Sequence, residues 1–284
     1  MIEIKHKVTG DVLFSVSADT LAGADLREVD LVEADLRNMD LRGANLSHAD
    51  LSYANLKNAK LQSANLIGTQ LAFTKLMRAD LTNARLSDGT PASAAILSEA
   101  ELYQAKLVGA DLRYTDLQQA DLSHAELSRA FLQGANLHRA TLKGSMLCGT
   151  MFVDANLSES DLRYTDLCDA HLNSANLMGA NLAEAFLEGN EKDKPATLAG
   201  ANLTRAILVC ASLSRVILKE ANLFQADLRN ADLSHALLGG AHLRRANVAG
   251  TDFTGVELAA VIMDFANFSK AKNADIPSYK RNLR

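Results

Sequence analysis

Leucine recurs at every fifth position over a long stretch of this chain. The 14 consecutive repeat centres from Leu21 to Leu86 are all Leu. Ala usually stands two residues before each centre and Asp or Asn one before, as in Ala24-Asp25-Leu26. We number the repeat so that Ala is position 1, Asp or Asn position 2 and Leu position 3, while positions 4 and 5 vary. This period constrains the fold more than any other feature of the sequence.

A period of five suits neither regular secondary structure. On an α-helix each repeat advances by about 500°, so the Leu side chains would spread around the axis. On a continuous strand the odd period would place successive Leu on alternate faces. All Leu can be buried only if the chain turns a corner once per repeat and coils around its own core. Such a solenoid buries its core by stacking, so it needs many repeats and covered ends.

The repeat continues over most of the chain in three blocks. They run from Leu21 to Leu86, from Leu97 to Leu187 and from Leu198 to Phe268. On these repeats the sequence resembles the pentapeptide-repeat family, whose consensus is Ala-(Asp/Asn)-Leu-x-x. The resemblance implies an all-β fold, a right-handed quadrilateral β-helix with four repeats per coil. For a chain with this many repeats it predicts about 12 coils.

The repeat also divides the chain into parts. Residues 1–20 alternate apolar and polar side chains in two runs, which predicts an N-terminal β-hairpin cap over the open end of the first coil. Residues 21–272 are the predicted β-helix, and residues 273–284 are a polar, basic C-terminal tail. Loops at 87–96 and 188–197, each with Pro and Gly, interrupt the β-helix.

Both loops shift the period. Leu86 to Leu97 and Leu187 to Leu198 are each 11 residues apart, which is two repeats plus one residue. We interpret each loop as one side of the coil that bulges outward by a residue. This register predicts that the two bulges lie on the same side, about 24 Å apart at ~4.8 Å per coil.

With that register, one side of the coil carries most of the negative charge. Aromatic residues at one repeat position flank the first bulge on the same side. The candidate partner-binding face comprises Asp30, Glu33, Asp50, Tyr53, Phe73, Asp111, Tyr114 and Asp154. This face is either a docking strip for a basic partner or the chance result of ordinary solubility.

Outward apolar side chains cluster on the side just before the bulges. The candidate apolar interface comprises Met146, Cys148, Phe186, Ile207 and Val209. Such a cluster is typical of an interface, here that of a homodimer, unless the loop at 188–195 folds over it. Cys148 and Cys168 are 20 residues apart and should be stacked neighbours. In a reducing cytoplasm we expect two free thiols there rather than a disulfide.

Composition and charge narrow the function further. The formal net charge of −5 disfavours direct nucleic-acid binding. No apolar run approaches the ~18 residues of a membrane span, and the N-terminus does not resemble a signal peptide. Three cysteines are too few for a disulfide framework. We therefore expect a cytoplasmic protein of bacterial type that does not enter a membrane.

The sequence predicts no enzyme, no metal and no cofactor. The seven His are scattered, and no two of them share metal-ligand spacing with a Cys or a carboxylate. A convex solenoid with a core of Leu and Ala offers no concave site in which catalytic groups converge. The expected function is a rigid scaffold that binds another protein, whose identity the sequence does not give.

The resemblance implies an alternative function. Some members of the family mimic a DNA duplex, bind DNA gyrase and protect against gyrase poisons such as quinolones. Two loops that project from the coil are a feature shared with that subgroup. This chain departs from the subgroup because its core is Leu rather than mixed Phe and Leu, and because its predicted negative charge is confined to one side.

Overall fold

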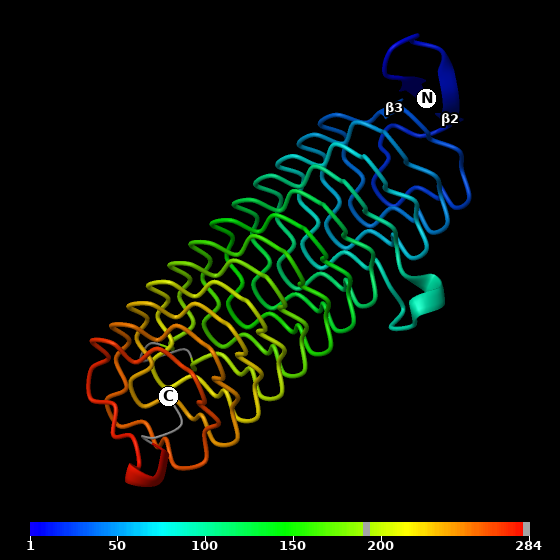
Figure 1. The fold of residues 1–284 in the computed structure, drawn as a ribbon. Helices are drawn as coiled ribbons and strands as arrows, with labels where there is room; N and C mark the ends of the chain where they lie inside the picture. The colour runs from blue at the N-terminus through cyan, green and yellow to red at the C-terminus, as the bar shows by residue number, and fades with distance from the viewer. Residues whose placement is uncertain (190–193, 281–284) are drawn as a thin grey trace. The chain divides into compact units, whose positions relative to one another are not determined.

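The computed structural model describes residues 1–189 and 194–280. Short bridges and turns, rather than long strands, make up most of it (Figure 1). Within the described ranges the continuous elements are β1 (Ile2–His6), β2 (Val12–Val16), β3 (Ala34–Asp35) and the 3-10 helices η1 (Pro91–Ser93) and η2 (Ser278–Lys280). No helix in these ranges has the length and apolar character needed to cross a membrane.

The chain folds into two compact units, Met1–Ser145 (unit 1) and Met146–Arg284 (unit 2). In each unit, parallel bridges join position-2 residues that are 20 apart, such as Asp30 with Asp50 and Asn156 with Asn176. Four five-residue repeats therefore complete one coil. The result is a β-helix solenoid, the class of fold that the period of five predicted.

Leucine fills the interior of the coils. Every position-3 Leu from Leu21 to Leu86 is at most 1% exposed, and most position-1 Ala are buried with them. Burying one such Leu contributes about 2 kcal/mol. Where Thr replaces Ala, the hydroxyl finds a backbone acceptor, as Thr69 Oγ1 does when it donates to Leu46 O at 2.9 Å. The core therefore tolerates a Thr such as Thr69 because its hydroxyl is hydrogen-bonded.

A tight turn closes almost every repeat. The N–H of position 1 donates to the carbonyl of the preceding position 3, for example Ala44 N to Leu41 O at 3.0 Å. The position-5 residue inside the turn has a positive φ, 59° at Asn38 and 60° at Tyr53. Most of these positions carry a residue other than Gly. Each such residue costs about 1 kcal/mol of backbone strain, which the buried leucines offset.

Position 2 holds the turn in place. Its side-chain oxygen accepts the backbone N–H of position 4, at 3.1 Å between Asp30 and Val32 and at 3.2 Å between Asn55 and Lys57. Asp and Asn are the residues whose short side chains reach the backbone two residues on. The Asp or Asn before each Leu is therefore a turn residue with a structural role.

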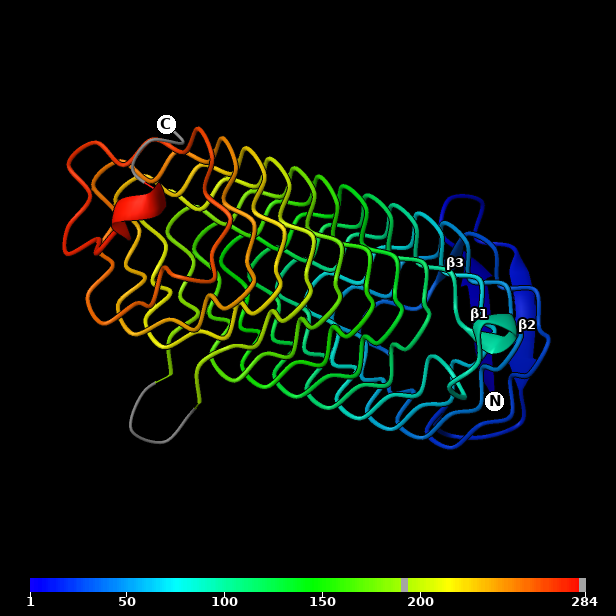
Figure 2. The same cartoon turned by 60° about the horizontal axis from the view of Figure 1, so that its bottom comes forward.

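The N-terminal segment forms an antiparallel hairpin of β1 and β2. β1 also pairs antiparallel with β3 in the first coil, and Lys7 N donates to Glu33 O at 2.8 Å. Ile4 in β1 is fully buried. The hairpin thus covers the edge of the first coil along one of its sides, where backbone groups would otherwise lack partners (Figure 2).

The first loop is an insertion into a single turn. Ala95 N donates to Leu86 O at 2.8 Å, the same bond that closes a regular turn. Across the loop, the bridge from Gln70 to Ile96 joins residues 26 apart instead of 20. Six residues are therefore inserted, and the coil advances by one repeat. The predicted bulge of one residue over two repeats is wrong, because the pairing of the coils, not the spacing of the leucines, sets the register.

Unit 2 repeats this arrangement at its own loop. Ala196 N donates to Leu187 O at 2.8 Å, and His171 bridges Thr197, again 26 residues apart. Of the loop predicted at 188–197, residues 190–193 lie outside the described residues. The prediction that both loops lie on one side used the incorrect register and is withdrawn.

Lys280 closes the last coil of unit 2. Its Nζ donates to three backbone carbonyl oxygens, those of Leu258, Ala259 and Val261, at 3.2, 2.5 and 2.7 Å. Lys280 is the last residue of η2, which follows the final repeats (Figure 1). One ammonium group thus satisfies carbonyls that a further coil would otherwise pair.

Candidate interaction surfaces

The bridges place the predicted partner-binding face on different sides of unit 1. One column of position-2 residues runs through Asp30, Asp50, Gln70, Ile96, Asp116 and Asn136, and its neighbour runs through Asp25, Asn45, Asn65, Arg85, Asp111 and Phe131. Asp111 therefore lies one side away from Asp30 and Asp50, and Tyr114 belongs to the same repeat as Asp111. Asp154 is part of unit 2. The predicted grouping fails because the first loop advances the coil by one repeat, not two.

The corrected register still leaves one acidic side in unit 1. We define the Asp30 side as positions 2, 4 and 5 of the repeats centred on Leu31, Leu51, Leu71, Leu97, Leu117 and Leu137. This side carries five carboxylates and one base, namely Asp30, Glu33, Asp50, Glu99, Asp116 and Arg139. The same three positions in the six repeats of the next side give a different balance of acidic and basic residues.

The next side, the Asp35 side, comprises the same positions of the repeats that follow. Its three carboxylates are Asp35, Glu101 and Asp121, and its five bases are Arg37, Lys57, Lys75, Arg78 and Lys143. Acidic residues thus outnumber basic ones on the Asp30 side, whereas basic residues outnumber acidic ones on the adjacent Asp35 side. Sequence reasoning missed Glu99 and Asp116 because both follow the loop, where its register was wrong.

Two aromatic rings stack on the Asp30 side. The rings of Tyr53 and Phe73 are parallel to within 2°, with centroids 4.8 Å apart. The two residues are 47% and 39% exposed. Both stand at position 5 of adjacent coils, so the coil spacing sets the distance between the rings. Such a pair gives this side an exposed apolar centre among its carboxylates.

Most carboxylates of the Asp30 side lack a basic neighbour. Glu33 Oε2 lies 3.6 Å from Lys7 Nζ and 3.7 Å from His6 Nε2, both in the N-terminal hairpin segment. Asp50 accepts the backbone N–H of Ser52 at 2.9 Å. Within the described part of the chain, no ion pair involves Asp50 or the three remaining carboxylates of this side.

Asp111, in contrast, is neutralised by its own repeat. Arg113 donates from Nε and Nη2 to the two oxygens of Asp111, at 2.8 and 2.6 Å. The same two-pronged pair recurs at Asp25–Arg27, Asp35–Arg37, Asp40–Arg42, Asp161–Arg163 and Asp227–Arg229. The hydrogen bonds that Arg113 donates to Asp111 raise the pKa of the guanidinium. Each Asp-Leu-Arg triplet is therefore a paired surface element.

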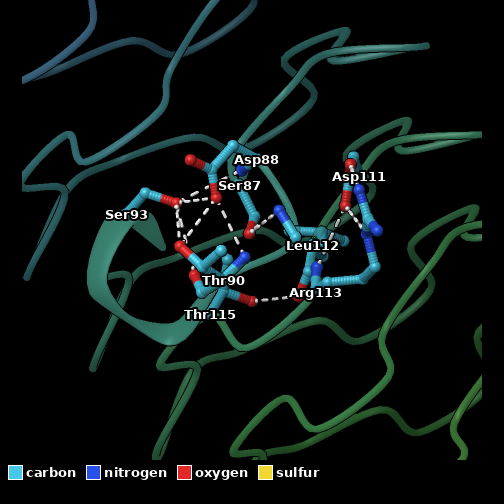
Figure 3. Close-up of polar contacts among 9 residues, drawn as sticks. Ser87, Asp88, Thr90, Ser93, Asp111, Leu112, Arg113 and Thr115 are labelled. Carbon is cyan, nitrogen blue, oxygen red and sulfur yellow. Dashed lines mark hydrogen bonds and ion pairs between the residues drawn. The ribbon is translucent and has the colours of Figure 1, made fainter.

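Asp88 organises the first loop from within (Figure 3). Its Oδ1 accepts the backbone N–H of Thr90 at 2.9 Å, the Thr90 hydroxyl at 2.8 Å and the Ser93 hydroxyl. These hydrogen bonds, the one from Ser93 first, hold the pKa of Asp88 below its usual value. The loop, which contains η1, projects from the coil (Figure 1).

The side chain of Arg113, in the next coil, packs against Gly89 of the loop. A Cβ added to Gly89 would lie 2.6 Å from Arg113 Nη1, and the φ of Gly89 is 96°. Glycine is needed here on both counts, because a side chain would displace the guanidinium and strain the backbone. Tyr114, which is 41% exposed, follows Arg113 directly. Apart from the Gly in the loop, nothing in the sequence indicated this contact.

The predicted apolar interface of unit 2 is divided in the structure. Met146 and Phe186 share a column, with Asp166 between them, whereas Ile207 lies in the neighbouring column next to Asn181. Phe186 and Ile207 are 37% and 39% exposed. Polar residues therefore interrupt the cluster, and a homodimer through it stays a prediction.

The two remaining members of that cluster differ in their surroundings. Val209 belongs to the repeat of Ile207 and is half-buried. Cys148 forms a disulfide with Cys168 in the adjacent coil, where the Cα atoms are 4.7 Å apart. The expectation of two free thiols is wrong, because stacked position-4 residues lie at a distance that a disulfide spans.

The repeats of this chain match the model of a known protein family. The family model for pentapeptide repeats matches residues 21–58, 54–89, 92–123, 115–152, 152–189, 196–234 and 236–272. These matches cover most of the chain. The chain belongs to the pentapeptide-repeat family. Both units of this pentapeptide-repeat protein form the solenoid that the family implies.

Several solved structures are similar to this pentapeptide-repeat protein. HetL, a protein involved in heterocyst differentiation regulation in the cyanobacterium Nostoc, is 33% identical over 73% of this chain and 87% of its own, with a TM-score of 0.39. A pentapeptide-repeat protein of the Arabidopsis thaliana thylakoid lumen is 32% identical over 35% of this chain and 68% of its own, with a TM-score of 0.29.

QnrB1, a plasmid-mediated fluoroquinolone resistance protein, is more distant. It is 17% identical over 87% of both chains, with a TM-score of 0.32. At this identity and score the likeness carries no functional argument. No curated protein matches the chain.

Proposed function

We propose that this pentapeptide-repeat protein is a non-enzymatic scaffold that binds another protein. The observation that carries the proposal is the ordered loop of unit 1, within which Asp88 accepts three hydrogen bonds and against which Arg113 of the next coil packs. A projection that is already rigid loses little conformational entropy when a partner binds. The loop leaves the coil between Leu86 and Leu97, at the border of the acidic Asp30 side.

The chemistry of the surface supports binding rather than catalysis. Among the described residues, no group of three His, Cys, Asp or Glu could hold a metal ion. The recurrent carboxylates at position 2 are engaged with the backbone or with Arg, as at Asp50 and Asp111. Residues held at regular spacing on a convex surface suit recognition of a partner more than convergence on a small substrate.

Two further expectations belong to the same proposal. The winding is that of a right-handed quadrilateral β-helix with about 12 coils, as the family implies. A cytoplasmic location stays a prediction.

A loop deletion tests the proposal. Removal of residues 88–93 leaves Leu-Ser-Ala-Ala-Ile-Leu, in which Leu86 and Leu97 are again five residues apart. The bond from Ala95 to Leu86 already has the geometry of a regular turn, so the shortened coil should fold. Ala94 would take position 5, where a change to Gly removes the backbone strain.

The measurement is capture of partners from the native host by the wild-type chain and by the deletion variant. We expect a protein that binds the wild type and is lost, or at least tenfold depleted, with the variant. Unchanged circular dichroism and melting would show that the variant is folded. Failure of the wild type to capture any protein under several salt conditions would contradict the proposal.

The DNA-mimic alternative has no observation in its favour here. The negative charge of unit 1 is concentrated on one side, and the neighbouring Asp35 side carries more bases than acids. A duplex presents phosphates on both strands around its axis. Inhibition of gyrase supercoiling by micromolar protein would nevertheless establish that activity and replace the proposal.

A further inference from the structure

Four carboxylates of the Asp30 side of unit 1 have no ion pair in the described part of the chain. The fifth, Glu33, pairs with Lys7 and His6 of the hairpin segment, and Lys7 Nζ also donates to Tyr53 O at 2.5 Å. Asp30 and Asp50 are bridge partners in adjacent parallel coils, so two carboxylates stand next to each other. Like charges directly opposite each other across paired strands are destabilising. No ion pair involves either of them in the described part of the chain. The side therefore keeps an electrostatic cost that a cationic partner would relieve.

On another side of the same unit, acidic and basic residues balance each other along the column of position-2 residues. Parallel bridges join its position-2 residues from coil to coil, in the order Asp40, Lys60, Asp80, Lys106 and Glu126. The charges alternate in sign from coil to coil, so each carboxylate has a cationic neighbour. The pKa of Asp40 reflects this, since Arg42 lowers it most and Lys60 lowers it further. The absence of such alternation on the Asp30 side is thus a local feature.

The aromatic pair lies in the middle of the unbalanced carboxylates. Tyr53 belongs to the repeat of Asp50, and Phe73 stands in the next coil, before the coil of Glu99. Exposed rings beside carboxylates favour side chains that carry both an apolar stem and a positive charge, because the stem packs on the ring while the charge meets the carboxylate.

We propose that the Asp30 side binds an extended basic segment of a partner protein. Lys or Arg side chains of the segment pair with Asp30, Asp50 and Glu99, and an apolar side chain between them packs on Tyr53 and Phe73. From Asp30 to Asp116 the side spans four coil steps, about 19 Å at ~4.8 Å per step. An extended segment of about six residues covers this length at ~3.3 Å per residue. This inference rests on the proposed function and names the chemistry of the partner.

A short synthetic peptide tests the inference directly. The probe is fluorescein-labelled Lys-Ala-Arg-Leu-Arg-Ala-Lys, titrated with the full chain and followed by fluorescence anisotropy. The charge variant is Asp30→Asn, Asp50→Asn and Glu99→Gln. Asn stands naturally at position 2 in Asn45 and Asn55 and makes the same bond to its turn, so the fold should persist.

We expect the charge variant to bind the peptide at least about tenfold more weakly than the wild type. A second variant, Tyr53→Ser with Phe73→Ser, should lose about tenfold as well. Ser is accommodated at position 5 in Ser63, whose φ is 56°. The aromatic variant separates packing on the rings from attraction by charge alone.

The control is Asp35→Asn, Glu101→Gln and Asp121→Asn, which removes the same number of carboxylates, three, from the Asp35 side. Its affinity for the peptide should stay within about twofold of the wild type. Equal weakening by the control, equal binding by the charge variant, or no binding by the wild type would each overturn the inference. A native partner that is captured by the wild type and lost on deletion of 88–93 would uphold the proposed function even then, so the two failures are distinguishable.

Discussion

The left-handed backbone at position 5 offers a sharp test of how this solenoid stores strain. Gln119 has a φ of 56° in a turn of unit 1, and its side chain is exposed. Ser123 occupies position 4 of the next repeat, outside the residues with positive φ. Replacement of each by Gly is a matched pair of changes. Both variants keep the backbone hydrogen bonds, such as Ser123 N to Asp121 Oδ1 at 2.9 Å.

The two variants should differ in sign. A residue other than Gly in the left-handed region costs about 1–2 kcal/mol, which Gln119→Gly recovers. Gly also increases the conformational entropy of the unfolded chain, which reduces this gain by about 0.5–1 kcal/mol. We therefore expect Gln119→Gly to stabilise by roughly 0.5–1 kcal/mol and Ser123→Gly to destabilise by a similar amount. The difference between the two is about 1–2 kcal/mol, a factor of roughly 5–30 in the local opening constant.

Native-state hydrogen exchange, resolved by mass spectrometry, is the suitable measurement, because coils of a repeat protein open locally. Amides of the coils that contain Gln119 and Ser123 should exchange more slowly in the first variant and faster in the second. Amides of the first coil serve as an internal reference. If both variants exchange faster by the same factor, the strain assigned to position 5 does not exist in solution.

Three further predictions concern single contacts. Reduction of the Cys148–Cys168 disulfide, which closes a loop of about 20 residues, should lower the free energy of unfolding by about 3 kcal/mol; dithiothreitol should lower the denaturation midpoint of the wild type but not that of a double Ser variant. Arg42 lowers the pKa of Asp40 from 3.8 to about 2, so the stability from this pair is present above pH 3.8 and is lost as the pH falls toward 2. Carboxyl NMR titration should give a pKa near 2 for Asp40 in the wild type and closer to 3.8 in Arg42→Gln. Lys280→Met should speed amide exchange in the last coil by removing three hydrogen bonds from Nζ, while the first coil is unaffected.

Much of the fold could be predicted from the sequence because the regularly spaced Leu residues mark the positions that are buried. With a Leu every five residues, the chain can bury every Leu side chain only if it forms a coil with one corner per repeat. The structure has this arrangement from Leu21 onward. The alternation before Leu21 likewise predicted the hairpin of β1 and β2. Both inferences use the hydrophobic period alone, which is insensitive to a shift by one repeat.

The surfaces were harder to predict because they depend on register across the loop. A gap of 11 residues between Leu86 and Leu97 is compatible with an advance of one repeat or of two. Only the bond from Ala95 to Leu86 and the bridge to Ile96 decide between them. The wrong choice moved Asp111 onto the acidic side and left Glu99 off it. The hydrogen bonds that Asp and Asn side chains accept from backbone N–H groups of their own turns were equally invisible to a count of charges.

The two kinds of terminal closure bear on how the chain avoids polymerisation. Any array of identical coils could in principle continue into the first coil of another molecule, because the growing face offers unpaired amides and carbonyls. In unit 1 a strand with its own hairpin partner pairs with the first coil, and in unit 2 the ammonium of Lys280 bonds three carbonyls of the last coil. A lysine cannot be replaced by an incoming coil without first being released from its carbonyls. Truncation of both ends should therefore convert a discrete molecule into one prone to form fibres.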